Sequence, residues 1–348
     1  MSNLVARRFY RAVDTTVRWR LGSLIAGAGS GQDPGETAGG TLFPPADPAQ
    51  FWGQSRVHNP ARLHRRELPV RGRSVQRIVE LVGPSQGPGS HHGSGRLRAR
   101  VAVHHAGEDA PLVLLLHGYA APVPYYEDHH MRLLLRRGVS AARLELPFHM
   151  TRRVPGRGAG HGFFSLDPAH SCAVLRQGVE DAAAVIAWAR REVTPNVAVL
   201  GFSLGGLVGC LCAALFELDA LVAVTPPCDL PTIVAEHSSA RVRRILSPLW
   251  ETDRDGARSG LAAAMAPVVP RNLTPVTAPD RITLIAAAED QIVGRAPVHE
   301  LAAAWGVECW DYPHGHVTVM TSRGISARIH DQLLRRLSGE AVVPALAG

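Results

Sequence analysis

Six short runs of mostly aliphatic residues alternate with helical stretches between residues 111 and 313, and this alternation constrains the fold most. The runs cover residues 111–118, 139–147, 196–203, 220–226, 281–290 and 307–313. Runs of this length are typical of strands that are buried on both faces. Strands that alternate with helices form mostly parallel sheets. We therefore predict an α/β protein whose sheet carries helices on both faces.

Two more strand-like runs precede these six, at residues 76–83 and 96–106, with a loop rich in Gly and Ser between them. This pattern favours an antiparallel hairpin with a long loop. The sequence therefore predicts eight strands, the first two antiparallel. The connection at about 226–279, after the sixth strand, is long enough to form a helical cap or lid, and a second long loop covers 147–170.

The N-terminal region differs from the rest of the chain. Residues 3–25 have the pattern of an amphipathic helix, with an apolar side that includes Val5 and Phe9 and an arginine side that includes Arg7 and Arg11. Such a helix packs across its own domain, or contacts a membrane surface or partner. We predict three regions, namely a helix with a Gly/Pro-rich linker at 1–69, the α/β domain at 70–338 and a tail at 339–348.

Composition narrows the classes of function. All 37 basic side chains are arginines, and the net charge is +7. The arginines are spread along the chain without a block of like charge or a recognition motif, so nucleic-acid binding is not expected. The five cysteines lack the spacing of a metal site and favour reduced, buried thiols. We expect neither a metal nor a cofactor.

The start of the chain also bears on location. It lacks the uninterrupted apolar segment and cleavage site of a secretory signal peptide. The longest apolar run, residues 204–216, is too short to span a bilayer and contains glycines. We expect a cytoplasmic protein, and leave its oligomeric state open.

One serine lies at the junction of a predicted strand and a predicted helix, in the stretch Gly201-Phe202-Ser203-Leu204-Gly205. The spacing G-x-S-x-G fits a sharp turn that exposes the serine hydroxyl. Gly201 and Gly205 are needed because the chain segments before and after the serine approach too closely for a Cβ atom. The Leu204 N–H, at the start of the helix, would then point to the same space. The pattern predicts that Ser203 is a nucleophile.

A nucleophilic serine needs an oxyanion site, a base and an acid. The stretch LLLHGYAAP ends a strand and offers the Tyr119 N–H as a second oxyanion donor, with Gly118 allowing close approach. Asp290 ends the seventh predicted strand, and His316 follows the eighth. The order Ser, Asp, His and the shared strand edge predict a triad of these three residues.

Other residues compete for these roles. Asp229 is a second conceivable acid, because it lies just past the sixth strand. Glu289 adjoins Asp290, but its side chain should point the other way in an extended chain. His314 competes with His316, although Gly315 gives His316 the tighter turn. His117 is expected to hold its own loop by hydrogen bonds rather than to take part in catalysis.

The stretches LLLHGYAAP, GFSLGG, AAAEDQIV and PHGHVTVM together resemble the serine α/β-hydrolase superfamily, in the family's order and over about residues 76–338. The resemblance implies an eight-stranded α/β-hydrolase fold with a cap. It also implies the roles already given for Ser203, Asp290, His316, Tyr119 and Leu204. The run LELPFHMTRR…HGFFSLDP further resembles a hydrolase group related to mammalian abhydrolase domain-containing protein 18.

The expected activity is hydrolysis of a carboxylic ester or thioester, with a small-molecule or lipid-like acyl substrate. A serine nucleophile argues against the branches of the superfamily that use aspartate. Two alternatives stay open: a non-catalytic binding protein of the same fold, and a serine peptidase. The acyl and alcohol parts of the substrate do not follow from the sequence.

Overall fold

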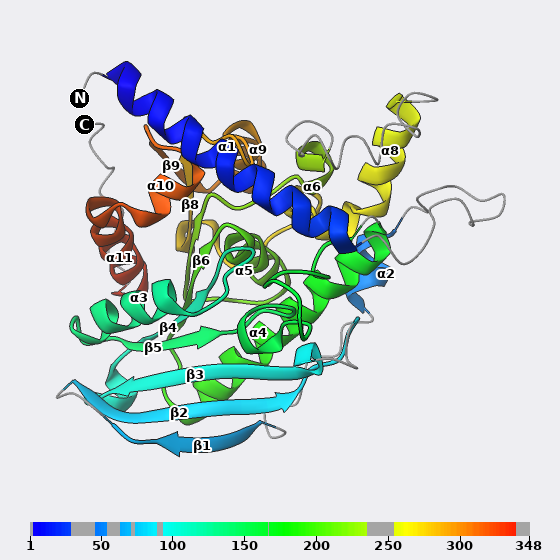
Figure 1. The fold of residues 1–348 in the computed structure, drawn as a ribbon. Helices are drawn as coiled ribbons and strands as arrows, with labels where there is room; N and C mark the ends of the chain where they lie inside the picture. The colour runs from blue at the N-terminus through cyan, green and yellow to red at the C-terminus, as the bar shows by residue number, and fades with distance from the viewer. Residues whose placement is uncertain are drawn as a thin grey trace.

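The strands join into one mostly parallel sheet with the order β1-β2-β3-β5-β4-β6-β7-β8-β9 (Figure 1). The computed structural model describes residues 3–28, 46–53, 63–70, 74–88, 93–165, 167–234 and 254–338. The strands are β1 (His64–Leu68), β2 (Val75–Pro84), β3 (Arg96–His104), β4 (Leu112–Leu116), β5 (Ser140–Leu144), β6 (Val197–Phe202), β7 (Ala220–Val224), β8 (Ile282–Ala287) and β9 (Glu308–Tyr312). The first three strands and the β3–β5 pair are antiparallel, and β5, β4 and β6 to β9 are parallel.

The expected count of eight strands is wrong by one. The additional strand, β1, pairs with β2 at the antiparallel edge, and we had assigned its residues to the linker at 1–69. Its sequence, HRREL, carries three charged residues, and four of its five side chains are exposed. An exposed edge strand lacks the apolar run by which buried strands are recognised, and charge is typical of such edges.

Helices flank the sheet and cross between its parallel strands. They are α1 (Asn3–Ala28), α2 (Pro48–Gly53), α3 (Tyr125–Leu135), α4 (Pro168–Glu192), α5 (Leu204–Leu215), α6 (Leu230–Thr232), α8 (Arg254–Ala264), α9 (Ala296–Trp305), α10 (His316–Thr321) and α11 (Arg323–Ser338). None of the described helices is both long enough and apolar enough to cross a bilayer.

Both faces of the sheet are covered, which explains why the central strands β4, β6 and β7 are apolar throughout. In β4, Leu112, Leu114 and Leu116 belong to the hydrophobic core shared with α4 and α5. Val113 and Leu115 alternate with them and belong to the second core, shared with α3 and α11. Successive side chains of a strand point to opposite faces. The two cores therefore fix the strands that carry the site.

The expected cap lies partly outside the described residues, which omit 235–253. The described parts of 226–279 are α6, α8 and short 3₁₀ turns.

Helix α1 packs against α10 and runs across the top of the view in Figure 1. Near the N-terminus of this helix, its apolar side is largely exposed. Val5 and Phe9, on the apolar side, are 50% and 54% exposed. Arg7 and Arg11 are themselves 54% and 60% exposed, and both reach the buried Glu289 of the domain. The contact of α1 with the domain is therefore partly ionic, through Glu289, while the apolar side chains at its start stay exposed.

Candidate active site

Ser203 lies between β6 and α5 in a strained backbone conformation. Its φ of 50° and ψ of −115° are unusual for a residue with a side chain. The Ser203 N–H stabilises the turn by donating to the carbonyl of Val224 at 2.8 Å. The sharp turn directs the chain from the buried strand into a buried helix and leaves the serine side chain partly accessible.

The imidazole of His316 joins Ser203 to Asp290. Its Nε2 lies 2.8 Å from Ser203 Oγ, and its Nδ1 lies 2.7 Å from Asp290 Oδ2. The other oxygen of Asp290 accepts from the Ile292 and Val293 N–H groups at 2.8 and 2.9 Å. Because a carboxylate can only accept a hydrogen bond, Nδ1 of His316 carries the proton and donates to Asp290. Nε2, which faces Ser203, is then the acceptor. The structure therefore brings together the three side chains predicted from the sequence.

The electrostatics of the pair follow from burial and mutual charge. Burial disfavours both charged forms, but the charge of His316 and its hydrogen bond hold the pKa of Asp290 below its usual value. For His316, burial alone would lower the pKa, whereas the carboxylates of Asp290 and Asp14 outweigh it and raise the pKa above its usual value. The site is therefore built to carry a positive charge on the imidazole.

The loop after β4 lies against the serine. A Cβ atom added to Gly118 would lie 3.6 Å from the Cβ of Ser203. His117 is buried and accepts the Leu146 N–H at Nε2, while its Nδ1 donates to the Gly118 carbonyl. Burial lowers the pKa of His117 to about 4. Both ring nitrogens of His117 serve the loop, in agreement with its expected structural role.

A second buried histidine supports the same loop and was missed from the sequence. His149 Nε2 accepts the Ala120 N–H at 3.0 Å, and its Nδ1 donates to the Pro147 carbonyl. Ala120 has a φ of 62°, so the loop turns in a left-handed conformation at this point. Among 17 histidines, no sequence pattern distinguished His149.

The competing residues have other contacts. Asp229 caps α6 through the Thr232 N–H at 3.0 Å and lies 3.5 Å from Arg271. Glu289 turns away from His316 to the arginines of α1. The ring of His314 stacks on Tyr10 of the same helix, with centroids 4.8 Å apart. None of the three is in hydrogen-bond contact with His316 in the described part of the chain.

Asp14 is the site residue that the sequence analysis missed entirely. It comes from α1, is fully buried, and accepts the His316 N–H at 2.7 Å. It is the only acidic residue in residues 3–28, on a helix with five arginines. That isolated carboxylate was the one signal that could have drawn attention to it.

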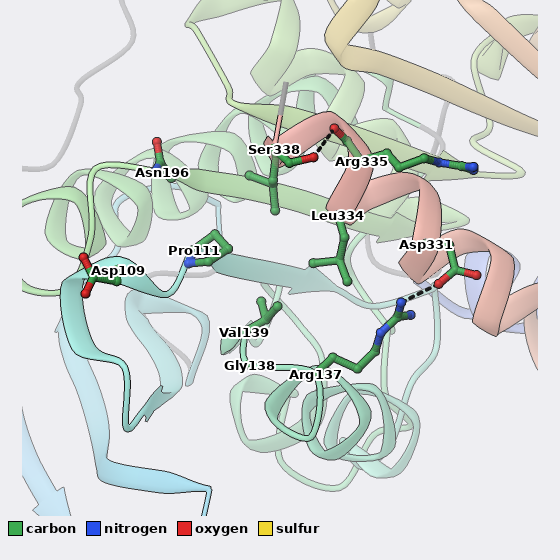
Figure 2. A pocket seen from close by; sticks show the side chains of 11 residues that line it. Asp109, Pro111, Arg137, Gly138, Val139, Asn196, Asp331, Leu334, Arg335 and Ser338 are labelled. Atoms are coloured by element: carbon green, nitrogen blue, oxygen red, sulfur yellow. Dashed lines mark hydrogen bonds and ion pairs between the residues drawn. The ribbon is translucent and has the colours of Figure 1, made fainter. Parts of the chain in front are cut away.

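A surface pocket of about 580 Å³ lies away from these residues (Figure 2). Pro111, Val139 and Asn196, which line it, immediately precede β4, β5 and β6. Ser203 follows the other end of β6, so the pocket and the triad lie at opposite ends of the parallel strands. In the pocket Arg137 pairs with Asp331 of α11.

Two other classes of reactive side chain are the metal ligands and the cysteine thiols. Within the described ranges, no group of three or more His, Cys, Asp or Glu side chains is placed to hold a metal ion. The five cysteines are unpaired thiols, and four of them are buried. Burial raises the pKa of Cys172 to about 12, and it also raises the pKa of Cys210 and Cys212.

Comparisons with known proteins agree with the architecture. A scan against protein-family models and a search of curated proteins each gave no match. Acetyl xylan esterase 1 from Thermoanaerobacterium sp. JW/SL YS485 is similar in structure, with a TM-score of 0.64, 16% identity, and coverage of 84% of this chain and 94% of that chain. An acetyl xylan esterase from Paenibacillus sp. R4 matches with a TM-score of 0.57, 16% identity, and coverage of 84% and 92%. At this identity the likeness concerns the fold, and the chain has the α/β-hydrolase fold.

Proposed function

We propose that the protein is a serine hydrolase that cleaves a carboxylic ester through an acyl-enzyme. The observation that carries the proposal is the unbroken hydrogen-bond chain from Asp290 through His316 to Ser203, with 2.7 and 2.8 Å between the bonded atoms. A serine becomes nucleophilic when an adjacent base can take its proton, and the base is effective when a third group orients it.

The reaction would proceed in two halves. Ser203 Oγ bonds to the carbonyl carbon of the ester while its proton passes to His316 Nε2. The N–H groups of Tyr119 and Leu204 stabilise the oxygen that becomes negative. The carbon–oxygen bond to the alcohol then breaks, and the alcohol takes the proton from His316. In the second half, the oxygen of a water molecule bonds to the acyl carbon while its proton passes to His316. The bond between the acyl carbon and Ser203 Oγ then breaks, Oγ takes the proton back from His316, and the acid is released.

The fold neighbours suggest the first substrates to test. Two of them are called acetyl xylan esterases, so short acyl esters are the reasonable starting point. A thioester would react through the same steps, because its carbonyl is attacked in the same way and a thiol replaces the alcohol. A peptidase would need a basic amine to leave, and no feature of the described residues favours a peptide over an ester.

Hydrolysis of p-nitrophenyl esters from acetate to palmitate tests the proposal. We expect the wild-type protein to release p-nitrophenol, and Ser203→Ala to lose about 10⁴-fold or more in kcat/KM. Asp229→Asn is the matched control, because this carboxylate does not contact His316. Activity that survives in Ser203→Ala, or a wild type that hydrolyses none of the esters and thioesters, would contradict the proposal and favour a non-catalytic binding protein.

We also infer that α1 contacts an anionic membrane surface. Leu4, Val5 and Phe9 are exposed on the helix at 60%, 50% and 54%, and arginines lie beside them. Apolar side chains next to cations suit the boundary between lipid headgroups and acyl chains. Flotation with anionic vesicles should carry the wild type to the top and leave Phe9→Asp behind. A wild type that stays at the bottom would contradict this inference.

The domain bounds, the cellular compartment and the cofactor complete the proposal. We propose that residues 70–338, together with β1, form the catalytic domain and that 226–279 contributes a cap over it. The reduced thiols favour a reducing compartment such as the cytoplasm. We propose no cofactor for the ester reaction, because the steps above need only the side chains, two backbone N–H groups and water.

A further inference from the structure

One buried carboxylate on α1 connects both loops of the proposed triad. Asp14 Oδ2 accepts the Gln291 N–H at 3.1 Å and the His316 N–H at 2.7 Å, and Oδ1 accepts the Val317 N–H at 3.2 Å. Gln291 follows Asp290 directly in the sequence. A single side chain therefore fixes the backbone beside the acid and the backbone of the base, about 300 residues away in the chain.

The carboxylate of Asp14 packs tightly against the loop that carries His316. A Cβ atom added to Gly315 would lie 2.8 Å from Asp14 Oδ2, and the three nearest atoms are all carboxyl atoms of Asp14. Gly315 has a φ of −86°, which other residues adopt readily, so its backbone conformation does not require glycine. The glycine is needed here because the carboxylate of Asp14 occupies the space of a side chain.

The charge of Asp14 acts on the same imidazole. Burial raises the pKa of Asp14, the repulsion of Asp290 adds to this, and the three backbone N–H donors oppose it. After the opposing effect of burial and the larger attraction of Asp290, Asp14 is a further cause that raises the pKa of His316.

Other charged and titratable groups around His316 come from two directions. From α1, Arg7 and Arg11 both pair with Glu289, which offsets part of their positive charge. From the loop before α10, His314 stacks on Tyr10, and burial lowers the pKa of His314. Asp14 and Asp290 are therefore the two carboxylates that act on the imidazole. In the described contacts, neither of them pairs with a cationic side chain other than His316 itself.

We propose that Asp14 is a positioning residue of the hydrolase site: it fixes the backbone of His316 relative to Asp290 and supports the positive charge that His316 gains during the reaction. The inference rests on the proposed function for its chemistry. It makes α1 a part of the active site rather than an external cover, because the helix supplies a group that the catalytic domain itself does not provide.

The pH dependence of His316 separates this role from a merely structural one. We would titrate the imidazole by NMR in Ser203→Ala protein, with and without Asp14→Asn. The asparagine removes the negative charge, so the pKa of His316 should fall by about half a unit or more. In protein with Ser203 intact, the acidic limb of kcat/KM should move to lower pH by the same amount.

Arg11→Ala is the matched control on the same helix. It removes a contact of α1 with the domain and leaves the carboxylate beside His316. Because it removes a positive charge, the pKa of His316 should stay the same or rise, even if its melting temperature falls by as much as that of Asp14→Asn. Equal downward shifts in both variants, or a change in melting temperature alone in Asp14→Asn, would overturn the proposal.

The contact with Gly315 provides a second, independent test. Gly315→Ala should displace Asp14 and lower kcat by about tenfold or more. In an Asp14→Ala background the same substitution should cost less than about twofold, because the space is then empty. Additive effects would contradict the proposal. The NMR titration does not need catalysis, so failure of the proposed function would be seen as absent ester hydrolysis while the effect on His316 persists.

Discussion

Gly201 packs directly against Gly205 across the turn at Ser203, and neither position has room for a side chain. A Cβ atom on Gly201 would lie 2.3 Å from the carbonyl oxygen of Gly205. A Cβ atom on Gly205 would lie 2.1 Å from the carbonyl oxygen of Leu116, at the end of β4. The obstructing atoms belong to the backbone, which cannot move aside as a side chain can.

The first prediction concerns these glycines. Gly205→Ala should lower the free energy of unfolding by about 3 kcal/mol or more, because β4 or α5 must shift. Gly178→Ala is the matched control within α4, where the nearest atoms to an added Cβ are side-chain atoms at 3.6 to 3.8 Å. It should be neutral or stabilising, by about 1 kcal/mol. Urea unfolding of both variants measures the difference, and equal stabilities would contradict the packing described.

The second prediction concerns the acid of the triad. Asp290→Asn leaves the shape of the side chain but removes the charge and favours the wrong tautomer of His316. We expect kcat/KM for p-nitrophenyl acetate to fall by about 10⁴-fold. Asp229→Asn should change it by less than about threefold, since Asp229 caps α6. A larger loss from Asp229→Asn than from Asp290→Asn would exchange the two assignments.

The third prediction concerns the pH profile. His316 must be neutral to accept the proton of Ser203, and its pKa is raised above the usual 6.5 by Asp290 and Asp14 against the effect of burial. Activity should therefore fall as the pH decreases through that raised pKa, so the acidic limb of kcat/KM should have its midpoint above 6.5. A midpoint below 6 in the wild type would mean that burial outweighs the two carboxylates.

The fourth prediction concerns the loop that carries Tyr119. His149→Leu removes the acceptor of the Ala120 N–H and loosens the loop next to the proposed oxyanion donor. We expect kcat to fall by about tenfold to hundredfold with little change in KM, because the donor acts on the transition state. Steady-state kinetics with a short acyl ester measure both constants. A pure increase in KM would indicate a role in substrate binding instead.

The sequence predicted the parts of the molecule in which local pattern and tertiary packing agree. The buried strands and helices were recognised because both faces of the sheet are apolar, as in β4 with its five aliphatic residues. The sharp turn at Ser203 was predicted from the two glycines that it requires. In these places one physical requirement, such as burial on both faces of the sheet or the lack of room for a Cβ atom, determines the residue type.

The parts that were missed depend on contacts between distant segments. β1 is charged and exposed, and it is a strand because β2 offers its edge. The ion pairs between α1 and the domain depend on Glu289, which lies 278 residues from Arg11. Asp14 and His149 are ordinary residues in sequence, and only the folded chain brings them to the loops they hold. Pairings of this kind cannot be obtained from periodicity.

The central claim is that Ser203 is the reactive nucleophile. Treatment with a fluorophosphonate, followed by peptide mass spectrometry, tests it most directly. We predict one adduct, on the peptide that contains Ser203, no adduct in Ser203→Ala, and slower labelling in Asp290→Asn. An adduct on another serine, or labelling of Ser203→Ala at the wild-type rate, would contradict the account.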